Sequence, residues 1–275
     1  MKKTYILKIG GSVLTVKSAS QAKLRQVLTT RIGEALGRAY DPKKMCLILI
    51  HGVGSFGHLH AHTHGLAQGT KSALKKLPRT LENNTLNQSL SARLAKIFQE
   101  KRLPVASINT ASVAINRKGR LETLSIDAIE NALGIGAIPM LHGDMIFDSD
   151  WGMSVCSGDT LIPFLAKKFD VEKIFFASDV DGIFSCDPHK FKHAQFIKET
   201  SLNDLLSGKS ITLAGSHHTD VTDGFRGKFG VFQNHSFPHL KKIHIFNGLD
   251  PTNFENVFKA SFSLGTKISI DSQKK

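Results

Sequence analysis

Residues 47–65 read LILIHGVGSFGHLHAHTHG, in which an apolar run leads into a glycine-rich turn and then into four alternating histidines. The apolar run extends from residue 45 to residue 50, which is typical of a strand covered on both faces in a parallel sheet. A helix normally starts after a turn of this kind. The stretch therefore predicts a strand, a turn and a helix, the repeating unit of an α/β fold.

The rest of the chain repeats this alternation. The hydrophobic pattern predicts further strands at residues 5–9, 104–108, 137–141, 173–177 and 242–246, and helices at residues 23–39, 81–98 and 161–169. We therefore expect an α/β protein with a mainly parallel central sheet. Glycine-bearing turns follow five of the strands, with the sequences KIGGS, HGVGSFGH, HGD, SDVDG and NG. Because ligands bind beyond the carboxyl ends of parallel strands, these turns predict a phosphate-binding rim.

The composition is that of an ordinary globular protein with an excess of positive charge. The chain has 275 residues, 36 basic and 23 acidic side chains, and a formal net charge of +13. The basic residues are dispersed and not interleaved with aromatic residues, which disfavours nucleic acid as a partner and favours small anionic molecules. Three widely spaced cysteines argue against a disulfide framework and favour the cytoplasm. Lys8 interrupts the first apolar run, so we expect no signal or membrane segment.

Gly52, Gly54 and Gly57 fit the G-x-G-x-x-G pattern of dinucleotide-binding folds. That pattern requires an acidic residue about 20 positions further on, which holds a ribose hydroxyl. Residues 68–79 read QGTKSALKKLPR and contain no carboxylate. The motif also follows the second predicted strand, although the first strand already has a glycine turn of its own. A dehydrogenase is therefore disfavoured.

The alternating histidines suggest a metal site, but their spacing does not support one. On a helix only His58 and His62, or His60 and His64, share a face. No glutamate accompanies either pair and no cysteine lies nearby, so we expect no metal site and exposed helix positions for His60, His62 and His64. Anion binding is the remaining interpretation, because the glycines let backbone N–H groups approach a phosphate. His58, at the start of the helix, would face the same anion.

Lys8 is the first candidate for a functional charge outside this stretch. A lysine inside a buried strand is costly unless an anion neutralises it, and Lys8 lies just before Gly10 and Gly11. The alternative is a lysine that extends along the sheet to solvent. Lys17 could return to the same phosphate, although by itself it is typical of a surface lysine.

Acidic and glycine-bearing segments supply the other candidates. Asp159 lies in the segment SGD before the predicted helix at 161–169, where it would be an ordinary N-cap residue or would orient a lysine or a metal. Asp179 and Asp181 follow a strand, a common position for ribose or base contacts, with a simple turn as the alternative. Gly224 and Lys228 lie in the polar stretch DVTDGFRGK, which could close over a nucleotide.

Together these segments resemble the amino acid kinase family, and within it the isopentenyl phosphate kinases. The resemblance covers almost the whole chain and rests on LKIGGSVLTVK, HGVGSFGH, PMLHGDMIFD, SGDTLIPFLA, SDVDGIFSCDP, DVTDGFRGK and the final FNG and GTKI segments. The histidine that ends HGVGSFGH distinguishes the isopentenyl phosphate kinases within this family, because relatives that phosphorylate carboxylates or nucleoside monophosphates lack a histidine there. The resemblance implies a three-layer αβα sandwich, the amino acid kinase fold, with an acceptor lobe at about residues 1–165 and an ATP lobe at about 166–275.

The resemblance also implies an ATP-dependent kinase that converts isopentenyl phosphate, or a similar small alkyl monophosphate, to the diphosphate in isoprenoid precursor synthesis. It implies ATP and Mg²⁺ as cofactors and a homodimer as the usual assembly, with neither nucleic acid nor a membrane as partner. The resemblance assigns catalysis to Lys8, Lys17 and His58. It assigns ATP binding to Lys8, Gly10, Gly11, Ser12, Gly54, Asp179, Gly224 and Lys228. It assigns the acceptor to Val53, His58 and Gly158, gives Asp159 a supporting role, and assigns no residue to a metal.

Three positions depart from the pattern of that family. Val53 replaces a glycine, which would narrow the approach to the acceptor or require a β-region φ. Asp223 replaces a glycine in the nucleotide segment, and residues 109–110 are Asn-Thr instead of Pro-Ser. A hydrocarbon pocket is expected along the helix at 81–98. A fosfomycin-type phosphonate kinase and a nucleotide-binding regulatory protein without turnover remain as alternatives. Retention of Lys8 and His58 together with Lys17 favours a kinase.

Overall fold

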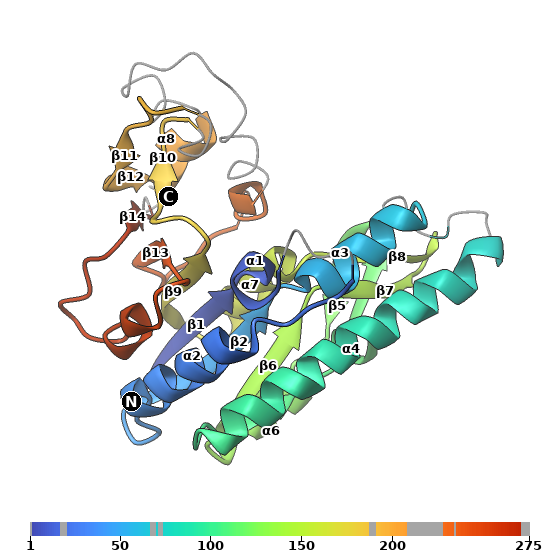
Figure 1. The fold of residues 1–275 in the computed structure, drawn as a ribbon, viewed down its shortest axis with the longest axis horizontal. Coiled ribbons are helices and arrows are strands. Elements are labelled where there is room, and N and C mark those ends of the chain that lie inside the picture. The colour runs from blue at the N-terminus through green and yellow to red at the C-terminus, as the bar shows by residue number, and fades with distance from the viewer. Residues whose placement is uncertain are drawn as a thin grey trace.

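The structure is a computed structural model that describes residues 2–16, 21–66, 70, 74–186, 191–207, 228–233 and 235–270. Its centre is an eight-stranded sheet (Figure 1). In spatial order the strands are β12 (Glu199–Ser201), β14 (Thr266–Ser269), β13 (Lys242–Asn247), β9 (Val171–Ser178), β1 (Lys3–Ile9), β2 (Met45–His51), β6 (Ile138–His142) and β3 (Val105–Ser107). All neighbouring strands in this sheet are parallel except β13 and β14, so the predicted mainly parallel sheet is confirmed.

Helices cover both faces of the sheet, as a three-layer sandwich requires. One face packs against α1 (Gly11–Leu14), α2 (Gln26–Ala39), α3 (Gly54–Thr63), α4 (Leu77–Glu100) and the 3₁₀-helix η2 (Pro251–Glu255). Figure 1 shows α2 and α4 crossing this face side by side. The core on the other face includes α6 (Asp127–Gly134), α7 (Gly158–Lys168) and α8 (Leu202–Ser207). The predicted αβα architecture is confirmed.

A second, four-stranded sheet extends the layer that contains α6 and α7. Its strands, in spatial order, are β5 (Arg120–Leu124), β4 (Ala114–Arg117), β7 (Asp144–Asp148) and β8 (Gly152–Cys156), and the short helix α5 (Thr110–Val113) leads into β4. The sequence did not indicate this sheet, because its strands are short and the buried residues of β4 are Ala114 and Asn116, which give no alternation of apolar and polar residues. Smaller elements are η1 (Leu74–Lys76) and the antiparallel pair β10 (Ile183–Phe184) and β11 (Phe196–Ile197).

Every strand and helix predicted from the sequence is present, with ends displaced by a few residues. The helix predicted at 81–98 begins earlier, at Leu77, because Pro78 in its first turn has a backbone already suited to a helix start. The helix predicted at 161–169 begins at Gly158, with Ser157 as its cap. Among the described residues, no helix is both long and apolar enough to span a membrane.

β1 shows how the sheet divides the core and positions a charge. Successive side chains of a strand point to opposite faces. Tyr5, Leu7 and Ile9 pack into the core beneath α2 and α4, and Ile6 packs into the core on the α7 side. Lys8 has the same parity as Ile6, so the strand directs its ammonium group toward α7 at the carboxyl end of the sheet.

The turns after β1 and β2 pack backbone against backbone. A Cβ at Gly11 would lie 2.4 Å from the Gly54 nitrogen, and a Cβ at Gly52 would lie 2.4 Å from the Gly11 nitrogen. Thr15 links the turns, because its buried hydroxyl donates to the Gly11 carbonyl at 2.8 Å and accepts from the Ser55 N–H at 2.9 Å. Glycine is therefore required in both turns.

We expect Gly11→Ala to destabilise the protein by about 1–3 kcal/mol, because the new methyl group meets backbone atoms that have no alternative rotamer. Urea unfolding monitored by circular dichroism measures the free energy of unfolding. Gly134→Ala is the matched control, since a Cβ there has no heavy atom within 4 Å and the residue lies in the last turn of α6. That control should be neutral or slightly stabilising. Equal stability of the two variants would contradict the close packing of the turns.

Candidate active site

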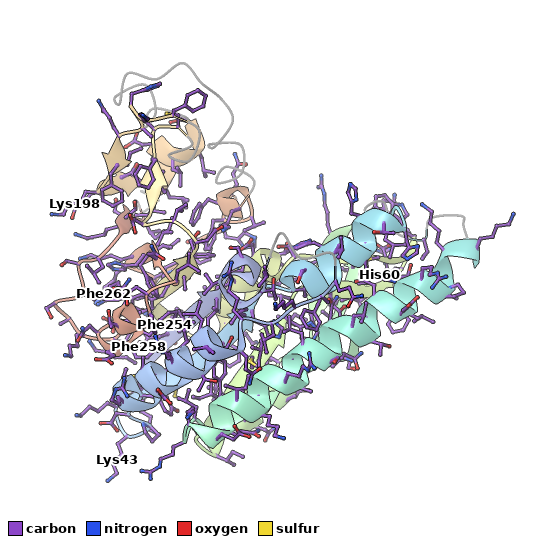
Figure 2. The ribbon with its side chains drawn as sticks, viewed as in Figure 1. Lys43, His60, Lys198, Phe254, Phe258 and Phe262 are labelled. Atoms are coloured by element: carbon purple, nitrogen blue, oxygen red, sulfur yellow. The ribbon has the colours of Figure 1, made fainter. Side chains whose placement is uncertain are left out.

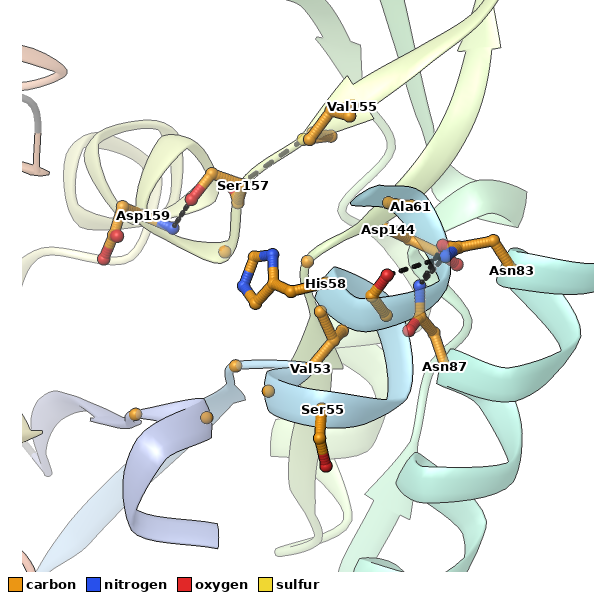
Figure 3. A pocket seen from close by; sticks show the side chains of 18 of the residues that line it. Val53, Ser55, His58, Ala61, Asn83, Asn87, Asp144, Val155, Ser157 and Asp159 are labelled. Carbon is orange, nitrogen blue, oxygen red and sulfur yellow. Dashed lines mark hydrogen bonds between the residues drawn. The ribbon is translucent and has the colours of Figure 1, made fainter. Parts of the chain in front are cut away.

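A cavity of about 650 Å³ opens at the carboxyl ends of β1, β2 and β6 (Figure 3). Its walls come from the two glycine turns, from α3, from the turn between β6 and β7, and from the start of α7. This is where a parallel sheet places its ligands. The residues assigned from the sequence that line the cavity are Lys8, Gly10, Gly11, Ser12, Val53, Gly54, His58, Gly158, Asp159 and Lys228.

Lys8 enters the cavity from β1 and forms an ion pair with Asp159 at the start of α7. Only 8% of Lys8 is exposed. Burial lowers the pKa of Lys8 and the nearby Lys228 lowers it further, whereas Asp159 raises it. In the structure Ser157 caps the helix, and the Asp159 carboxylate contacts the Lys8 ammonium.

Lys8 and Lys228 converge on the same aromatic ring. The ammonium nitrogens of both residues lie 5.9 Å from the centroid of Phe176, which is the register partner of Lys8 in β9. Each ammonium is attracted to the face of the ring, but the two charges repel one another. An anion bound between them would remove this repulsion, so this end of the cavity is suited to a phosphate.

His58 projects into the cavity from α3. Figure 3 shows its ring directed across the cavity toward the turn that carries Ser157 and Asp159. Partial burial lowers the pKa of His58, and the positive charge of Lys8 lowers it further. The ring is therefore mainly neutral near pH 7 without a ligand, and a bound phosphate dianion would raise the pKa again.

Two helices begin at the cavity and present their N-terminal ends to it. α3 begins at Gly54, whose φ of +49° favours glycine, and no side chain caps this end of the helix. α7 begins at Gly158, where the Ser157 hydroxyl accepts from the Asp159 N–H at 3.1 Å. The positive ends of both helix dipoles and the lysine charges act on the same space. The site is therefore electropositive from the main chain as well as from side chains.

Val53 fits into the site without backbone strain. Its φ of −82° and ψ of −16° are ordinary helical values, and its side chain is buried. The side chain fills space beside Gly57, where a Cβ would lie 2.5 Å from Val53 Cγ2 and 2.4 Å from Asn87 Oδ1. The β-region backbone given as the alternative for Val53 is therefore not present, and Gly57, one turn later, leaves space for the side chain.

The end of the cavity next to α4 is polar. Asp144 accepts hydrogen bonds from the amides of Asn84 at 2.6 Å and Asn87 at 2.8 Å, and burial raises the pKa of Asp144 to about 7. Asn83 donates to the Gly57 carbonyl at 2.8 Å. Met145 supplies part of the apolar lining. The hydrocarbon pocket expected along this helix therefore has asparagines, in place of leucines, on its α4 side.

Leu81 and Leu90, two leucines of the same helix, have different positions. Leu81 is exposed and Leu90 is in the core, so neither lines the cavity. The residues of α4 that reach the cavity are Asn83 and Asn87, which lie one helical turn apart.

The remaining histidines of α3 pair as the helical spacing predicts. The rings of His60 and His64 lie side by side with centroids 4.5 Å apart, and His62 lines the cavity beside His58. The expectation that His60 is exposed was wrong, because its side chain is only 13% exposed and Nε2 lies 3.4 Å from Glu82 of α4. Within the described ranges, no three His, Cys, Asp or Glu side chains are grouped to hold a metal ion.

Some assigned residues do not join the cavity. Asp179 lies beyond it, although it follows β9 as predicted, and Asp181 accepts a hydrogen bond from the Asn247 amide at 2.8 Å. Lys17, Asp223 and Gly224 lie outside the described residues.

The departure at residues 109–110 has a structural role. Asn109 caps α5, where its side chain accepts from the Ala111 N–H at 3.1 Å, and the Thr110 hydroxyl donates to the His142 carbonyl at 2.6 Å. These contacts hold the chain that follows β3 against the end of β6.

The sequence missed several residues that shape the cavity. Asp144 lies in the HGD turn, which was identified as a glycine turn without a role for its carboxylate. Asn83 and Asn87 are polar residues on the buried side of α4, and that placement was the available signal. Thr15 gave no signal, because its role depends on two turns distant in sequence.

The sequence of the chain matches the model of the amino acid kinase family over residues 3–229. It is 29% identical to the isopentenyl phosphate kinase of Methanothermobacter thermautotrophicus, with 96% of this chain and 98% of that protein covered. It is 27% identical to the isopentenyl phosphate kinase of Thermoplasma acidophilum, with 96% and 99% covered. A solved structure of isopentenyl phosphate kinase superposes with a TM-score of 0.79 at 23% identity, over 96% of this chain and all of that one, which supports the fold.

The pair Lys8–Asp159 should behave as a coupled buried ion pair. Lys8→Met leaves the carboxylate uncompensated and Asp159→Asn leaves a buried ammonium beside Lys228, so each single substitution should destabilise the protein. The double variant should lose less than the sum, with a coupling free energy of about 1–3 kcal/mol. Urea unfolding of the wild type, the two single variants and the double variant gives the four free energies of unfolding from which the coupling is calculated.

The pair Lys3–Glu172 is the control, because it also joins a lysine of β1 to a carboxylate, at the opposite end of the strand, while Lys3 is 61% exposed. Its cycle, with Lys3→Met and Glu172→Gln, should give a coupling of about 0–1 kcal/mol. Additive effects in the Lys8 cycle would show that the two buried charges are not coupled.

Proposed function

The chain belongs to the amino acid kinase family, and we propose on that basis that it is an ATP-dependent kinase that converts isopentenyl phosphate, or a similar small alkyl monophosphate, to the diphosphate. Relatives named isopentenyl phosphate kinase that match over nearly the whole chain support this proposal. The observation that carries it is the single cavity in which Lys8, His58 and the ends of two helices surround space for two anionic groups.

Transfer of a phosphoryl group requires alignment of the reactants and positive charge around the transferring oxygens. Lys8 supplies that charge from a fixed position, because β1 and Asp159 restrain its side chain. Backbone N–H groups of the turns at Gly10, Gly11 and Gly54 would contact the ATP phosphates, together with Ser12. Lys228 would add a second charge on the side of ATP. The assignments of Lys17, Asp179 and Gly224 belong to the same proposal.

The acceptor in this proposal is itself a phosphate, which removes the need for a strong base. Its attacking oxygen is already anionic near neutral pH, whereas a hydroxyl acceptor would require proton removal. Of the two carboxylates that line the cavity, Asp159 is bound to Lys8 and Asp144 is held by two asparagines. His58 would hold the acceptor phosphate together with Gly158 and the Val53 loop, and as a cation it would reduce repulsion between the two phosphates.

Mg²⁺ would enter this site as the counter-ion of ATP. Magnesium keeps several water ligands and binds through substrate phosphates and one or two carboxylates, so a ready-made protein cage is not required. Asp159 is the carboxylate nearest to the lysine that faces the phosphates. We also propose the cytoplasm as the location and a homodimer as the assembly. The three free cysteines agree with a reducing compartment.

The division into lobes follows from the same assignment. Residues up to about 165 include His58, Val53 and Gly158 and would form the acceptor lobe. Residues from about 166 onward include Lys228 and would form the ATP lobe. The central sheet runs through both parts, since β1 pairs with β9, and the transferring phosphoryl group would lie near this junction.

A phosphonate kinase of the fosfomycin type is the second candidate, and the polar end of the cavity favours it. Asn83, Asn87 and Asp144 could contact an acceptor that carries an oxygen atom in its tail, which isopentenyl phosphate lacks. A nucleotide-binding regulator without turnover is the third candidate. It would make no use of a cavity that holds both Lys8 and His58.

Incubation with Mg-ATP and a panel of acceptors separates these functions. We expect ADP release with isopentenyl phosphate and dimethylallyl phosphate, and little with fosfomycin or simple amino acids. A coupled ADP assay measures turnover, and ³¹P NMR identifies the diphosphate product. Lys8→Met provides the background rate, since loss of one stabilising charge at the transferring group should lower kcat by about 10²–10³-fold. Turnover of fosfomycin alone would select the second candidate, and no ADP with any acceptor would contradict the kinase.

His58 should bind the acceptor through a proton-linked contact. We expect His58→Gln to raise the KM for the monophosphate roughly ten- to hundredfold, the loss of a charged hydrogen bond, and to change the KM for ATP much less. The pKa of His58 is low without ligand and should rise beside a phosphate dianion, so the wild-type protein should take up protons when the monophosphate binds.

Affinity for the monophosphate should therefore fall as the pH rises through the raised pKa of the complex, and this dependence should be weaker in the variant. Titration calorimetry in buffers of different ionisation enthalpy measures the proton uptake. His62→Gln is a control, because His62 lines the same cavity one turn further along α3. Equal losses for ATP and monophosphate in His58→Gln would contradict the assignment.

A further inference from the structure

A second basic cluster lies on the central sheet, away from the candidate active site. Four lysines and one histidine surround a small cavity of about 200 Å³. We call it the basic groove, and its polar lining is Lys173 of β9, Lys242 and His244 of β13, Lys267 of β14, Lys198, Glu199, Ser261 and Ser263.

Strand register places the core of this cluster on one face of the sheet. Lys242 is directly opposite Lys173, and His244 is directly opposite Lys267. Lys242 and His244 are two residues apart on β13 and therefore point to the same side. The groove is a product of the sheet pairing, because its basic residues come from segments far apart in the sequence.

The basic groove and the active-site cavity are separate. Lys173 and Lys242 lie near the amino-terminal ends of parallel strands, whereas the active site lies at the carboxyl ends. The groove also lies on the opposite face of the sheet from Lys8, because Lys173 has the parity of Phe175 and Lys8 is the partner of Phe176. In Figure 2, Lys198 and Phe262 are on the side of the molecule away from His60, and the two cavities share no lining residue.

The lining residues of the groove carry little negative charge to offset its lysines. Glu199 is the carboxylate of its lining, and it is bound to Lys267 at 2.9 Å. Like charges directly opposite in neighbouring strands destabilise a sheet, so the register of Lys173 and Lys242 carries an energetic cost. Burial lowers the pKa of Lys173; Glu172 opposes that shift, and Lys242 adds to it. A bound anion would relieve the repulsion between these two lysines.

His244 supplies an independent sign of a ligand. The residue is 3% exposed and its ring is stacked on Phe175, yet Nδ1 has no hydrogen-bond partner among the described residues. Burial, together with the positive charges of Lys173, Lys242 and Lys267, lowers the pKa of His244 to about 4. The ring is therefore neutral near pH 7, and one of its two nitrogens carries a proton.

We propose that the basic groove binds a phosphate or diphosphate group. Ammonium, imidazole and hydroxyl donors together are typical of phosphate sites, and Lys173, Lys242, His244 and two serines provide them here. The volume is below that of sites for drug-sized ligands, which begin at about 300 Å³, so the groove admits a phosphoryl group and not a whole nucleotide. This inference does not depend on the reaction proposed above.

Calorimetric titration with inorganic diphosphate tests the proposal. The variant Lys173→Gln/Lys242→Gln removes two charges from the groove, and Lys241→Gln is the matched control, since Lys241 is exposed and does not line the groove. The groove variant lacks the charged hydrogen bond that each of the two lysines would donate to diphosphate. We therefore expect it to bind diphosphate at least tenfold more weakly than the wild type. The Lys241→Gln protein should bind within about threefold of the wild type, because an exposed charge is screened by salt.

Thermal unfolding with and without diphosphate gives the second measurement. Diphosphate should raise the Tm of the wild type through mass action, and this rise should be reduced in the groove variant. Without diphosphate the groove variant should be as stable as the wild type or more stable, because the opposed lysines no longer repel. A purely structural role for the lysines would instead lower the Tm in both conditions.

Two further measurements separate the possible causes of a loss of diphosphate binding. KM values for ATP and the acceptor should not change in the groove variant, so loss of diphosphate binding there is distinguishable from failure of the kinase proposal. ADP tests whether a diphosphate attached to a nucleoside is accepted, and a weaker effect of the groove substitutions on ADP than on inorganic diphosphate would indicate the free anion. Equal diphosphate affinity in the groove and Lys241 variants would overturn the proposal.

Discussion

The close approach of two glycine turns is the constraint on which the candidate active site depends. Gly11 and Gly52 meet with so little space that neither can carry a side chain, and Thr15 hydrogen-bonds both turns. This contact brings the ends of β1 and β2 together and fixes where α3 begins. Main-chain N–H groups can then face an anion directly, because no Cβ stands in front of them. Side chains are then needed only to place full charges at particular points of the cavity.

Lys8 is the clearest of those charges, and its position follows from strand parity. The same alternation that sends Ile6 into the core sends Lys8 toward α7, where burial would favour the neutral amine if Asp159 were absent. The ion pair therefore preserves the charge of Lys8 in a buried position. Among the described residues, the other carboxylate that lines the cavity, Asp144, is held by Asn84 and Asn87. Lys228, whose ammonium lies at the same distance from the Phe176 ring, repels the charge of Lys8. A phosphate bound beside the two ammonium groups would reduce this repulsion.

The sequence predicted the central sheet and most of the assigned residues that line the cavity because both depend on local signals. Apolar runs and glycine turns identify strand ends, and the carboxyl-end rule then brings Lys8, Gly54 and His58 together without any structure. Contacts between distant segments gave no such signal. Thr15 acts only because two turns lie side by side, and Asn87 only because α4 packs against the start of β7. β4 is too short and too polar to be recognised. His60 was placed on the surface because its helix was considered without the neighbour, α4, that covers it.

The excess of positive charge can be interpreted only from the positions of the basic residues in the folded sheet. Spread along the chain, a net charge of +13 suggested no more than an anionic partner. In the structure, β9 takes part in two separate concentrations of that charge, since Phe176 on one face lies under Lys8 and Lys228, and Lys173 on the other face opposes Lys242. Alternation along one strand keeps the two clusters on opposite sides of the sheet. A ligand in the basic groove would then act on β9 and β13 from the amino-terminal end, whereas the proposed ATP and acceptor would bind at the carboxyl end.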